Sequence, residues 1–495
     1  MKKIKICLYL FTVIVLAAIF LSCSDNTDST QTTDLTEEDI VTEVTEEIDP
    51  LEALKPDIPE LNFDGYEFTV VSRDDGTHGY PLHTRDIFAE METGNTINDA
   101  VYRRNIEIEE KYNIKIAIIS LPESDSEETA NNMIKNAVLA GEDLYDLVYT
   151  HALYGATTAA AGYLLNWNTL PYVDVSKPWW CEGAIQGLSV GDKLFLALSD
   201  ASVSSTQYAY MVYFNKDMQK EYGAPDLYQM VGSGQWTFDK ISEVTKGVTT
   251  DLNGDGIMDN EDKYGAIISY AALNFFYAGG NTVMAKDNDN MPYLNITSER
   301  AANTFEKAYD ICHSDYVRFA PGWEDEFEMM QMFESNKALL YFHSLSKIDR
   351  LRDMDYDFGV LPYPKLDESQ EKYYTYVDGH SPLLAVPKVA SNLERTGAII
   401  EELSYLSRKY LLPAYYDVTL KTKFARDEES AEMLDYIING RVYDFGYVYD
   451  GTTAYIFQSQ INAKNREFIS AIEKRMDAAQ KNLDKIITAY SEAVG

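Results

Sequence analysis

The run Phe68-Thr69-Val70-Val71 is the first of three short apolar segments that predict buried strands. The second is Ile114–Ile118 and the third is Leu147–Tyr149. Between them, apolar residues recur at helical spacing, which predicts one helix over 95–112 and another over 126–140. A strand–helix–strand–helix–strand order requires right-handed crossovers and gives a parallel sheet. We therefore expect an α/β lobe in this part of the chain.

Polar residues follow two of these predicted strands. Arg73 and Asp74 come after the first strand, and His151 comes after the third. In open α/β sheets, ligands bind beyond the carboxyl ends of the strands, where the strand order reverses. These three residues are therefore candidate ligand contacts. The alternative is that they are ordinary solvated loop residues.

Strand and helix patterns alternate again further along the chain, without a repeat of fixed period. Additional strand-like runs lie at 193–197, 210–214, 338–342 and 358–362. The segment from Ile461 to Val494 has the apolar spacing of an amphipathic helix. The α/β pattern therefore extends well beyond the first lobe.

Four short motifs follow one another along the chain: Tyr213–Asp217, Gln235–Asp239, Phe333–Leu340 and Phe358–Pro362. With these motifs in this order, the sequence resembles the extracellular solute-binding proteins of ABC transporters, in their sugar-binding branch. The resemblance implies a two-lobed α/β fold of the periplasmic-binding-protein type II class, with a hinged cleft. It also implies a non-enzymatic function, in which a small solute such as a mono- or oligosaccharide is captured for a transporter permease.

The same resemblance implies that the chain crosses between the lobes more than once. We expect the first lobe to combine 61–168 with 335–395. The second lobe would combine 169–334 with 396–495, including the C-terminal helices. Closure over a ligand would follow from bending at the hinge, because contacts from both lobes form only in the closed state.

The N-terminal residues have the features of an export signal. Three lysines precede an apolar stretch that ends near Phe20, and the small residue Ser22 precedes Cys23. Cys23 resembles the lipid-carrying cysteine of bacterial lipoproteins, although that family usually has different residues where this chain has Phe20 and Leu21. We expect residues 1–22 to be removed and Cys23 to anchor the protein at the outer face of the cytoplasmic membrane. The alternative is one uncleaved membrane helix.

Composition limits the partners of this protein. Residues 23–60 are rich in Thr, Asp and Glu, which predicts an extended acidic tether. The net charge of −38 argues against nucleic acid, because binding it requires Lys and Arg to replace the phosphate counterions. We expect a monomer that touches the membrane only through its anchor. Apart from Cys7 and Cys23, the chain has Cys181 and Cys312, which we expect to be free thiols, with a disulfide as the alternative.

The sharpest local motif is the acidic loop 251–262. Oxygen-bearing side chains fall at its first, third, fifth, ninth and twelfth positions, with Gly256 at the sixth for the tight turn. This spacing resembles an EF-hand calcium loop, except that an Asp stands at the twelfth position where that loop prefers Glu. The candidate calcium ligands are Asp251, Asn253, Asp255, the backbone carbonyl of Ile257, Asp259 and Asp262. We expect a structural Ca²⁺ here, and the alternative is an empty acidic turn.

Aromatic residues are candidates for sugar binding, because the apolar faces of sugar rings stack on them. Trp236 heads a predicted helix and is expected in the core. Trp179 and Trp180 lie in an irregular stretch where both cannot enter one core, and Trp323 lies in an acidic loop, so each is a candidate contact. The other candidates lie near strand ends or follow an aromatic run, and they are Tyr210, Tyr270, His343 and Asp378.

Two other functions remain open at this level. A secreted carbohydrate-active enzyme needs two carboxylates at a defined separation, and with 80 acidic residues chance pairs are plentiful. The sequence has neither an HExxH zinc helix nor a phosphate-binding GxxxxGK[ST] loop. A surface receptor that presents its ligand to a sensor would have the same sequence features as a transport protein.

Overall fold

Two β-sheets form the core of the computed structural model, which describes residues 50–73, 83–121, 126–351, 353–416 and 428–492. The first sheet has the order β12-β3-β1-β2. Its strands are β1(Tyr66–Arg73), β2(Ile114–Leu121), β3(Leu147–His151) and β12(Pro382–Ala385). β1 pairs in parallel with β2 and β3, and β12 lies antiparallel to β3 at one edge. The expected α/β arrangement of this part of the chain is confirmed.

The helices of this part begin and end where the sequence predicts. In α3(Thr96–Tyr112), the Asn95 side chain accepts hydrogen bonds from the backbone N–H groups of Ile97 and Asn98. Asn113, in the left-handed region at φ 49°, ends the helix. Both α3 and α4(Ser126–Ala140) contact strands of the first sheet. They therefore cover the first sheet.

The second sheet has the order β10-β4-β9-β5-β8. Its strands are β4(Tyr210–Asn215), β5(Tyr264–Ser269), β8(Val317–Ala320), β9(Ala338–Ser344) and β10(Phe358–Leu361). β5 runs parallel to β8 and β9, while β4 is antiparallel to β9 and β10. Every residue of β4, β5 and β9 is buried, which fits strands covered on both faces.

Three expectations about the architecture need correction. The expected first lobe included 335–395, yet β9 and β10 pair with the second sheet and only β12 of that range joins the first. The run 193–197 is buried from Leu194 onward but forms no strand, and its Ala197 makes an isolated bridge to Leu384 of β12. The single C-terminal helix expected over 461–494 is divided, because its described residues form the end of α18(Gly451–Asn462), then α19(Phe468–Glu473) and α20(Met476–Glu492).

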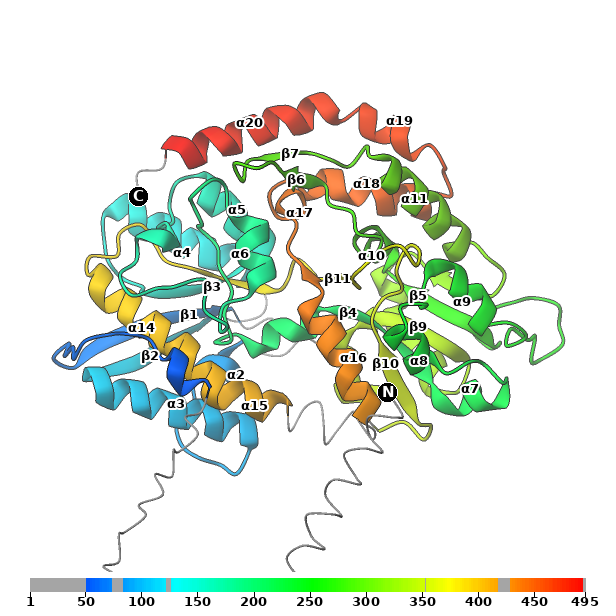
Figure 1. Cartoon of the computed structure of the whole chain (residues 1–495), viewed down its shortest axis with the longest axis horizontal. Helices are drawn as coiled ribbons and strands as arrows, with labels where there is room; N and C mark the ends of the chain where they lie inside the picture. The colour runs from blue at the N-terminus through cyan, green and yellow to red at the C-terminus, as the bar shows by residue number, and fades with distance from the viewer. Residues whose placement is uncertain (1–49, 74–82, 122–125, 352, 417–427, 493–495) are drawn as a thin grey trace, which may run out of the picture. The chain divides into compact units, whose positions relative to one another are not determined.

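Short segments connect the two sheets. The two-stranded pair β11(Thr375–Tyr376) and β13(Arg441–Val442) lies between them, and Figure 1 shows α16 and α17 in the same central region. The 3-10 helix η4(Val203–Tyr208) leads directly into β4. The remaining α-helices are α2(Thr84–Ile87), α5(Ala152–Ala160), α6(Glu182–Leu188), α7(Lys216–Glu221), α8(Leu227–Gly232), α9(Phe238–Val244), α10(Ala272–Ala278), α11(Glu299–Cys312), α12(Glu326–Glu334), α13(Ile348–Leu351), α14(Leu393–Leu406), α15(Leu412–Tyr415), α16(Glu428–Asn439), α17(Phe445–Tyr449), α18(Gly451–Asn462), α19(Phe468–Glu473) and α20(Met476–Glu492).

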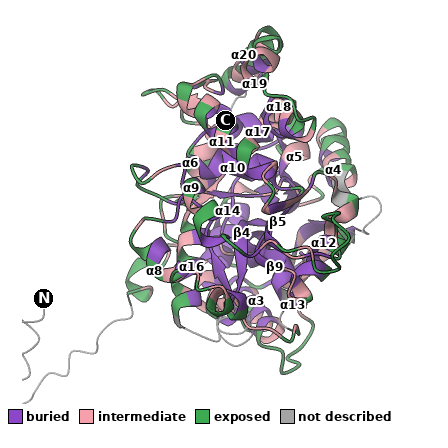
Figure 2. Cartoon of the chain, turned by 90° about the vertical axis from the view of Figure 1, so that its right-hand side faces the viewer, coloured by how far each residue is buried: buried purple, intermediate pink, exposed green. Residues whose placement is uncertain are grey.

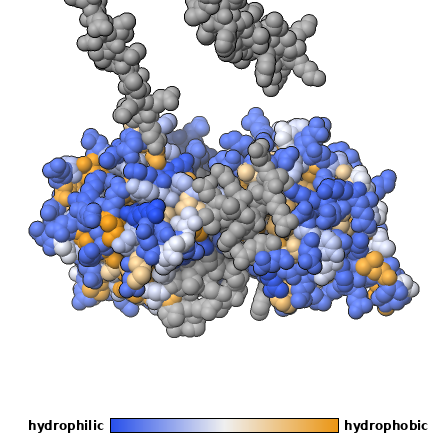
Figure 3. Space-filling model, turned by 90° about the horizontal axis from the view of Figure 1, so that it is seen from below, coloured by the Kyte–Doolittle hydropathy of each residue, from blue (hydrophilic) through white to orange (hydrophobic). Residues whose placement is uncertain are grey.

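The burial of residues follows the arrangement of the sheets and helices. Figure 2 shows β4, β5 and β9 as buried and the outward faces of the surrounding helices as exposed. The face seen in Figure 3 is mainly hydrophilic, with hydrophobic atoms in small separate groups. Trp236 is fully buried and its indole N–H donates to the carbonyl oxygen of Pro362, as its expected core position requires. Among the described residues, no helix combines the length and the apolar character that a membrane span needs.

Candidate functional site

Ends of strands from both sheets meet around the loop that joins β11 to β12. From the first sheet, Arg73 at the end of β1 donates through Nη2 to the carbonyl oxygen of His380. The backbone N–H of Ala152, directly after β3, donates to the carbonyl oxygen of Gly379 at 3.2 Å. From the η4–β4 segment, the carbonyl oxygen of Tyr208 accepts from the backbone N–H of Asp378 at 3.0 Å. We call residues 378–380, with the strand ends around them, the strand-end site.

Asp378 and two histidines form the polar centre of the strand-end site. His380 Nδ1 lies 2.6 Å from Asp378 Oδ1, and both side chains are partly exposed. The ring of His151 packs edge-on against His380, with 4.9 Å between the centroids. Burial, and then the positive charge of Arg73, hold the pKa of His151 well below its usual value, so His151 is neutral at neutral pH. The centre therefore offers the Asp378 carboxylate, the His380 ring paired with it, and the neutral imidazole of His151.

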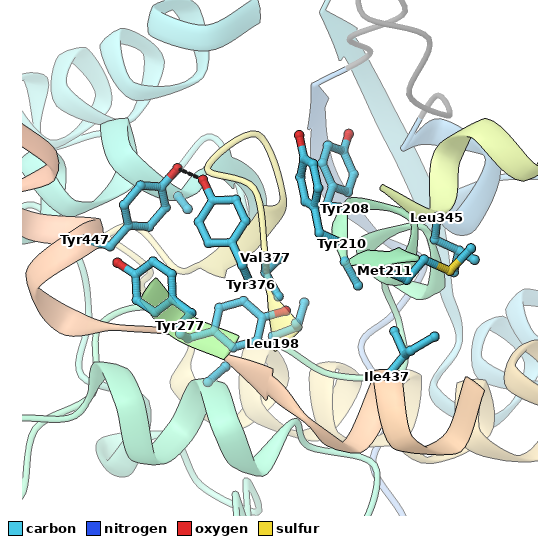
Figure 4. Packing of buried hydrophobic residues seen from close by; sticks show 14 of the residues in the cluster. Leu198, Tyr208, Tyr210, Met211, Tyr277, Leu345, Tyr376, Val377, Ile437 and Tyr447 are labelled. Atoms are coloured by element: carbon cyan, nitrogen blue, oxygen red, sulfur yellow. Dashed lines mark hydrogen bonds between the residues drawn. The ribbon is translucent and has the colours of Figure 1, made fainter. Parts of the chain in front are cut away.

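Tyrosines surround this centre on one side. The hydroxyl of Tyr376 donates to that of Tyr447 at 2.6 Å, as Figure 4 shows, and Tyr447 also accepts from the backbone N–H of Gly379 at 3.1 Å. Tyr447 and Tyr455 place their hydroxyls 3.2 Å apart. Burial, and then the charge of Asp378, raise the pKa of Tyr455 to about 12. These hydroxyls are therefore protonated and can donate hydrogen bonds.

The second sheet contributes the other side. Tyr270 follows β5 in the left-handed region at φ 48° and is 37% exposed. The pKa of Tyr270 is raised by burial and then by the charge of Asp378. The backbone of Ala209, directly before β4, forms a bridge with Val377, next to Asp378. Tyr210 of β4 stacks on His343 of β9, with 5.7 Å between the ring centroids. Aromatic and polar groups from both sheets thus share one location.

Six of the ten predicted contacts lie in the strand-end site: Arg73, His151, Tyr210, Tyr270, His343 and Asp378. Asp74 and the side chain of Trp323 lie outside what the structure describes. Sequence analysis missed Tyr376, Tyr447 and Tyr455, because no local pattern distinguishes them from the other tyrosines of the chain. His380 was adjacent to a named candidate, and its role becomes visible only through its contacts with Asp378 and His151.

Comparison with solved structures places this architecture in a known fold. A cyclo/maltodextrin-binding protein complexed with maltotetraose matches with a TM-score of 0.54 at 13% identity, over 87% of this chain and 98% of that one. A family 1 extracellular solute-binding protein from Bifidobacterium longum subsp. infantis matches with a TM-score of 0.52 at 13% identity, over 87% of this chain and 100% of that one. The chain has the solute-binding-protein fold. The fold expected from the sequence motifs is therefore confirmed.

Other comparisons define how far this likeness extends. UgpB from Mycobacterium tuberculosis in complex with glycerophosphocholine also matches, with a TM-score of 0.52 at 14% identity, over 85% of this chain and 99% of that one. No protein-family model matches the sequence, and no curated protein matches it. At these identities the solute-binding-protein fold is shared, and the ligand of this chain has to be argued from its own residues.

Trp179 and Trp180 are not part of the strand-end site. Both indole N–H groups donate to the same carboxylate, that of Glu401, at 3.0 Å each, one to each oxygen. Trp179 is fully buried and Trp180 is 4% exposed. Both rings therefore enter the interior of the solute-binding-protein fold, because α14 supplies a buried acceptor for them. The expectation that they cannot share one core was wrong.

A separate cavity of about 1320 Å³ lies beside α6 and β13. Cationic residues form part of its lining, including Lys177, Lys286, Arg408 and Arg441. Trp180, one of the ten predicted contacts, also lines this cavity, whereas none of the six in the strand-end site does. Among the described residues, polar groups from both sheets converge at the strand ends and not in this cavity, so the strand ends are the candidate ligand site.

One short sequence in this region resembles an enzyme motif. The five residues from Gly187 to Gly191 match the GxSxG pattern of a nucleophile elbow. In that elbow the serine sits between a strand and a helix. Here Ser189 instead follows the C-terminus of α6, and its hydroxyl accepts a hydrogen bond from Asn290 at 3.0 Å. Among the described residues, none of the hydrogen bonds to Ser189 involves a histidine. The structural context of a nucleophile elbow is thus missing.

The loop 251–262 is closed by its own side chains. Asp251 accepts from the backbone N–H groups of Gly254 and Gly256, and Asp262 accepts from those of Leu252 and Asp259. Both glycines lie in the left-handed region. Among the described residues, no three His, Cys, Asp or Glu side chains are grouped in a way that could hold a metal ion. Cys181 and Cys312 are free thiols, half-buried and buried respectively, as expected.

The histidine next to the strand-end site gives a prediction of pH dependence. His83 is fully buried, its Nε2 lies 2.7 Å from the Tyr208 hydroxyl, and burial followed by the charges of Arg73 and Arg85 holds its pKa well below 6.5. The unfolded chain takes up a proton at His83 below pH 6.5 and the folded chain does not, so stability falls as the pH falls. We expect wild type to lose up to about 1.4 kcal/mol per pH unit relative to His83→Gln below pH 6.5.

Urea unfolding of both proteins between pH 5.0 and 7.5 measures this difference. Groups common to the two proteins cancel in the comparison, so the slope reports His83 alone. Parallel stability profiles for wild type and His83→Gln would show that His83 is protonated in the folded state.

Proposed function

We propose that this protein captures a small solute, a mono- or oligosaccharide, outside the cytoplasm and delivers it to the permease of an ABC transporter. The observation that carries the proposal is the meeting of strand ends from both sheets at Asp378 and its neighbours in the loop. The solute-binding-protein fold supports it, and a structural neighbour is a maltodextrin-binding protein complexed with maltotetraose. Neighbours in this fold are binding proteins, which fits binding without chemical change.

The chemistry of the strand-end site suits a sugar. Asp378 can accept hydrogen bonds from ring hydroxyls, and the protonated tyrosines can donate to them. Tyr270 offers an exposed aromatic face on which a sugar ring can stack. Because the contacts come from two sheets joined by short segments, closing the sheets over a ligand completes the site. Hinge closure is therefore the expected response to binding.

A thermal-shift screen of the purified protein against a library of sugars tests the proposal. A ligand that binds only the folded state raises the melting temperature by mass action. The proposal expects a shift with one sugar family and recovery of that sugar unchanged. Cleavage of the sugar would favour a carbohydrate-active enzyme, and a shift with peptides alone would exclude the sugar.

Asp378→Ala is expected to weaken sugar binding by about 10- to 100-fold, because a charged acceptor for hydroxyl groups is lost. Titration calorimetry with the sugar identified in the screen measures the loss. Asp289→Ala is the matched control, since Asp289 is an exposed acid in the turn between β6(Met284–Lys286) and β7(Pro292–Leu294). Equal affinities for the two variants would remove Asp378 from the site.

Calcium at the loop 251–262 is a further proposal. The spacing of its oxygens and the two left-handed glycines support it, although the carboxylates of the described loop accept backbone N–H groups instead of converging. Calcium would stabilise the second sheet, which follows the loop directly at β5. We expect calcium at 1 mM to raise the melting temperature over that in chelator, and Asp251→Ala to abolish the rise. Equal melting temperatures in calcium and chelator would identify an empty acidic turn.

From the sequence alone, we also propose that residues 1–22 are a removed signal, that Cys23 carries a lipid anchor and that 23–60 form a tether. These residues lie outside the described part of the chain, except for 50–60, which lie at its start. They would place the protein at the outer face of a bacterial cytoplasmic membrane. Mass spectrometry of the N-terminal peptide from membranes checks this, because acyl groups on Cys23 add a defined mass. We also propose that the protein is a monomer, which light scattering measures.

A further inference from the structure

Unpartnered polar atoms are concentrated at the carboxyl end of β1. Arg73 is fully buried, and its Nε and Nη1 have no hydrogen-bond partner among the described residues. The same holds for Nδ1 of the fully buried His83. Buried donors without acceptors are rare in folded proteins, because each loses its hydrogen bond to water. Such a cluster marks a place where an external acceptor can be bound.

Among the described residues, no charged group balances Arg73. A buried guanidinium is costly unless it is paired, yet no described carboxylate forms an ion pair with it. The buried carboxylate of Asp86 is paired with a different cation: its Oδ1 lies 3.5 Å from Nε of Arg85, and its Oδ2 accepts from the backbone N–H of Ser204 at 2.6 Å. His83 is neutral, because its pKa is held well below the usual value by burial and then by Arg73 itself. The missing charge is therefore negative.

The guanidinium is positioned at the strand-end site. Its third nitrogen, Nη2, donates to the carbonyl oxygen of His380, whose side chain contacts both Asp378 and His151. Arg73 and His151 both contact His380, and burial, then Arg73, then His380 lower the pKa of His151. Nε and one Nη of an arginine form a planar pair of donors that matches two anionic oxygens. Arg73 thus presents an anion-binding group beside a sugar-binding one.

We propose that the solute is an acidic sugar, a ring that carries an anionic oxygen group such as a carboxylate, and that Arg73 binds this group. This inference rests on the proposed function and narrows its ligand class. The net charge of −38 repels anions in general, so an acidic ligand needs one specific cation to offset that repulsion. Asp378 can accept hydrogen bonds from neutral hydroxyls of the same ring. A carboxylate and a phosphate ester share the required chemistry, and the experiment separates them.

Titration calorimetry of the purified protein with three matched ligand sets tests the inference. The sets are uronates with one and two rings, the methyl esters of the same uronates, and the corresponding sugar 6-phosphates. We expect an anionic member to bind about 10- to 100-fold more tightly than its neutral ester, the range for a charge-assisted hydrogen bond made in a buried site. Preference for the uronate or the phosphate identifies which anionic group is bound.

Variants of Arg73 give a second readout. Arg73→Gln is expected to bind the uronate and its ester equally, while Arg73→Lys retains part of the preference because it keeps the charge but not the planar fork. Arg466→Gln is the control, since Arg466 is exposed and pairs with Glu306 and Asp310 far along the chain from the site. If Arg73→Gln does not fold, the ester comparison on wild type decides alone.

The possible outcomes distinguish failure of the acidic-sugar inference from failure of the proposed function. Wild type that binds neutral sugars as tightly as acidic ones overturns the acidic-sugar inference and leaves the proposed function standing. Wild type that binds neither, while it remains folded by circular dichroism, overturns the proposed function itself.

Discussion

Trp179→Ala is expected to lower the free energy of unfolding by about 3–5 kcal/mol, the range for truncating a large buried aromatic side chain. Trp179 has no exposed surface, packs edge-on against Tyr405 at 5.3 Å between centroids, and donates to Glu401. The substitution leaves a cavity and removes one of the two N–H groups that hold a buried carboxylate. Burial already raises the pKa of Glu401 to about 7, so the charged form depends on these donors.

Trp179→Phe separates the loss of stability caused by the cavity from the loss caused by the missing N–H group. It keeps most of the ring volume and deletes the N–H group, so we expect a loss of about 1–3 kcal/mol from the unsatisfied Glu401 oxygen. Urea unfolding followed by circular dichroism measures all variants. A loss below about 1 kcal/mol for Trp179→Ala would mean that the tryptophan faces a solvent-filled space and not the core.

Gly187→Ala is expected to destabilise the protein by about 3 kcal/mol, at the upper end of the range for overpacking. A Cβ at Gly187 would lie 1.9 Å from the carbonyl oxygen of Tyr443, and one at Gly183 would lie 2.6 Å from that of Arg441. The two glycines are one helical turn apart, so they form the face of α6 that rests on β13. Backbone atoms cannot move aside as a flexible side chain can, so α6 or β13 must shift.

A shift of β13 caused by Gly187→Ala is expected to extend toward the strand-end site. The reason is that β13 pairs with β11, and β11 leads directly to Asp378. Gly232→Ala is the matched control: Gly232 ends α8, is exposed, and has no atom within 4 Å of an added Cβ. We expect this control to be neutral or to stabilise by up to about 1 kcal/mol, since alanine favours helix over glycine. Similar losses for both variants would show that α6 does not pack on β13 at this distance.

Local sequence signals predicted the first sheet and its helices well. Phe68–Val71 and Leu147–Tyr149 are dense in strand-forming residues, and Asn95 supplies a cap that fixes where α3 begins. The partner of a strand is not a local property. β9 lies between β4 and β5 because long-range pairs such as Tyr213 with Tyr341 align, and nothing near residue 341 indicates this.

The residues of the candidate site divide in the same way, into those that local sequence predicts and those that depend on long-range contacts. Arg73, His151 and His343 were found because strand ends can be read from the sequence, and strand ends are where ligands of α/β folds bind. Trp179 and Trp180 were misplaced because the acceptor that allows their burial, Glu401, lies more than two hundred residues away in the chain. Tyr447 and Tyr455 were missed because their position depends on how α17 and α18 pack against the rest of the fold.

Titration calorimetry of the purified protein with neutral and acidic mono- and disaccharides, combined with small-angle X-ray scattering of the same samples, tests the central claim most directly. The account predicts that one class of sugar binds with one molecule per chain, is recovered unchanged, and reduces the radius of gyration as the two sheets close over it. A folded protein that binds no sugar, or that binds one without Asp378 affecting the affinity, would contradict it.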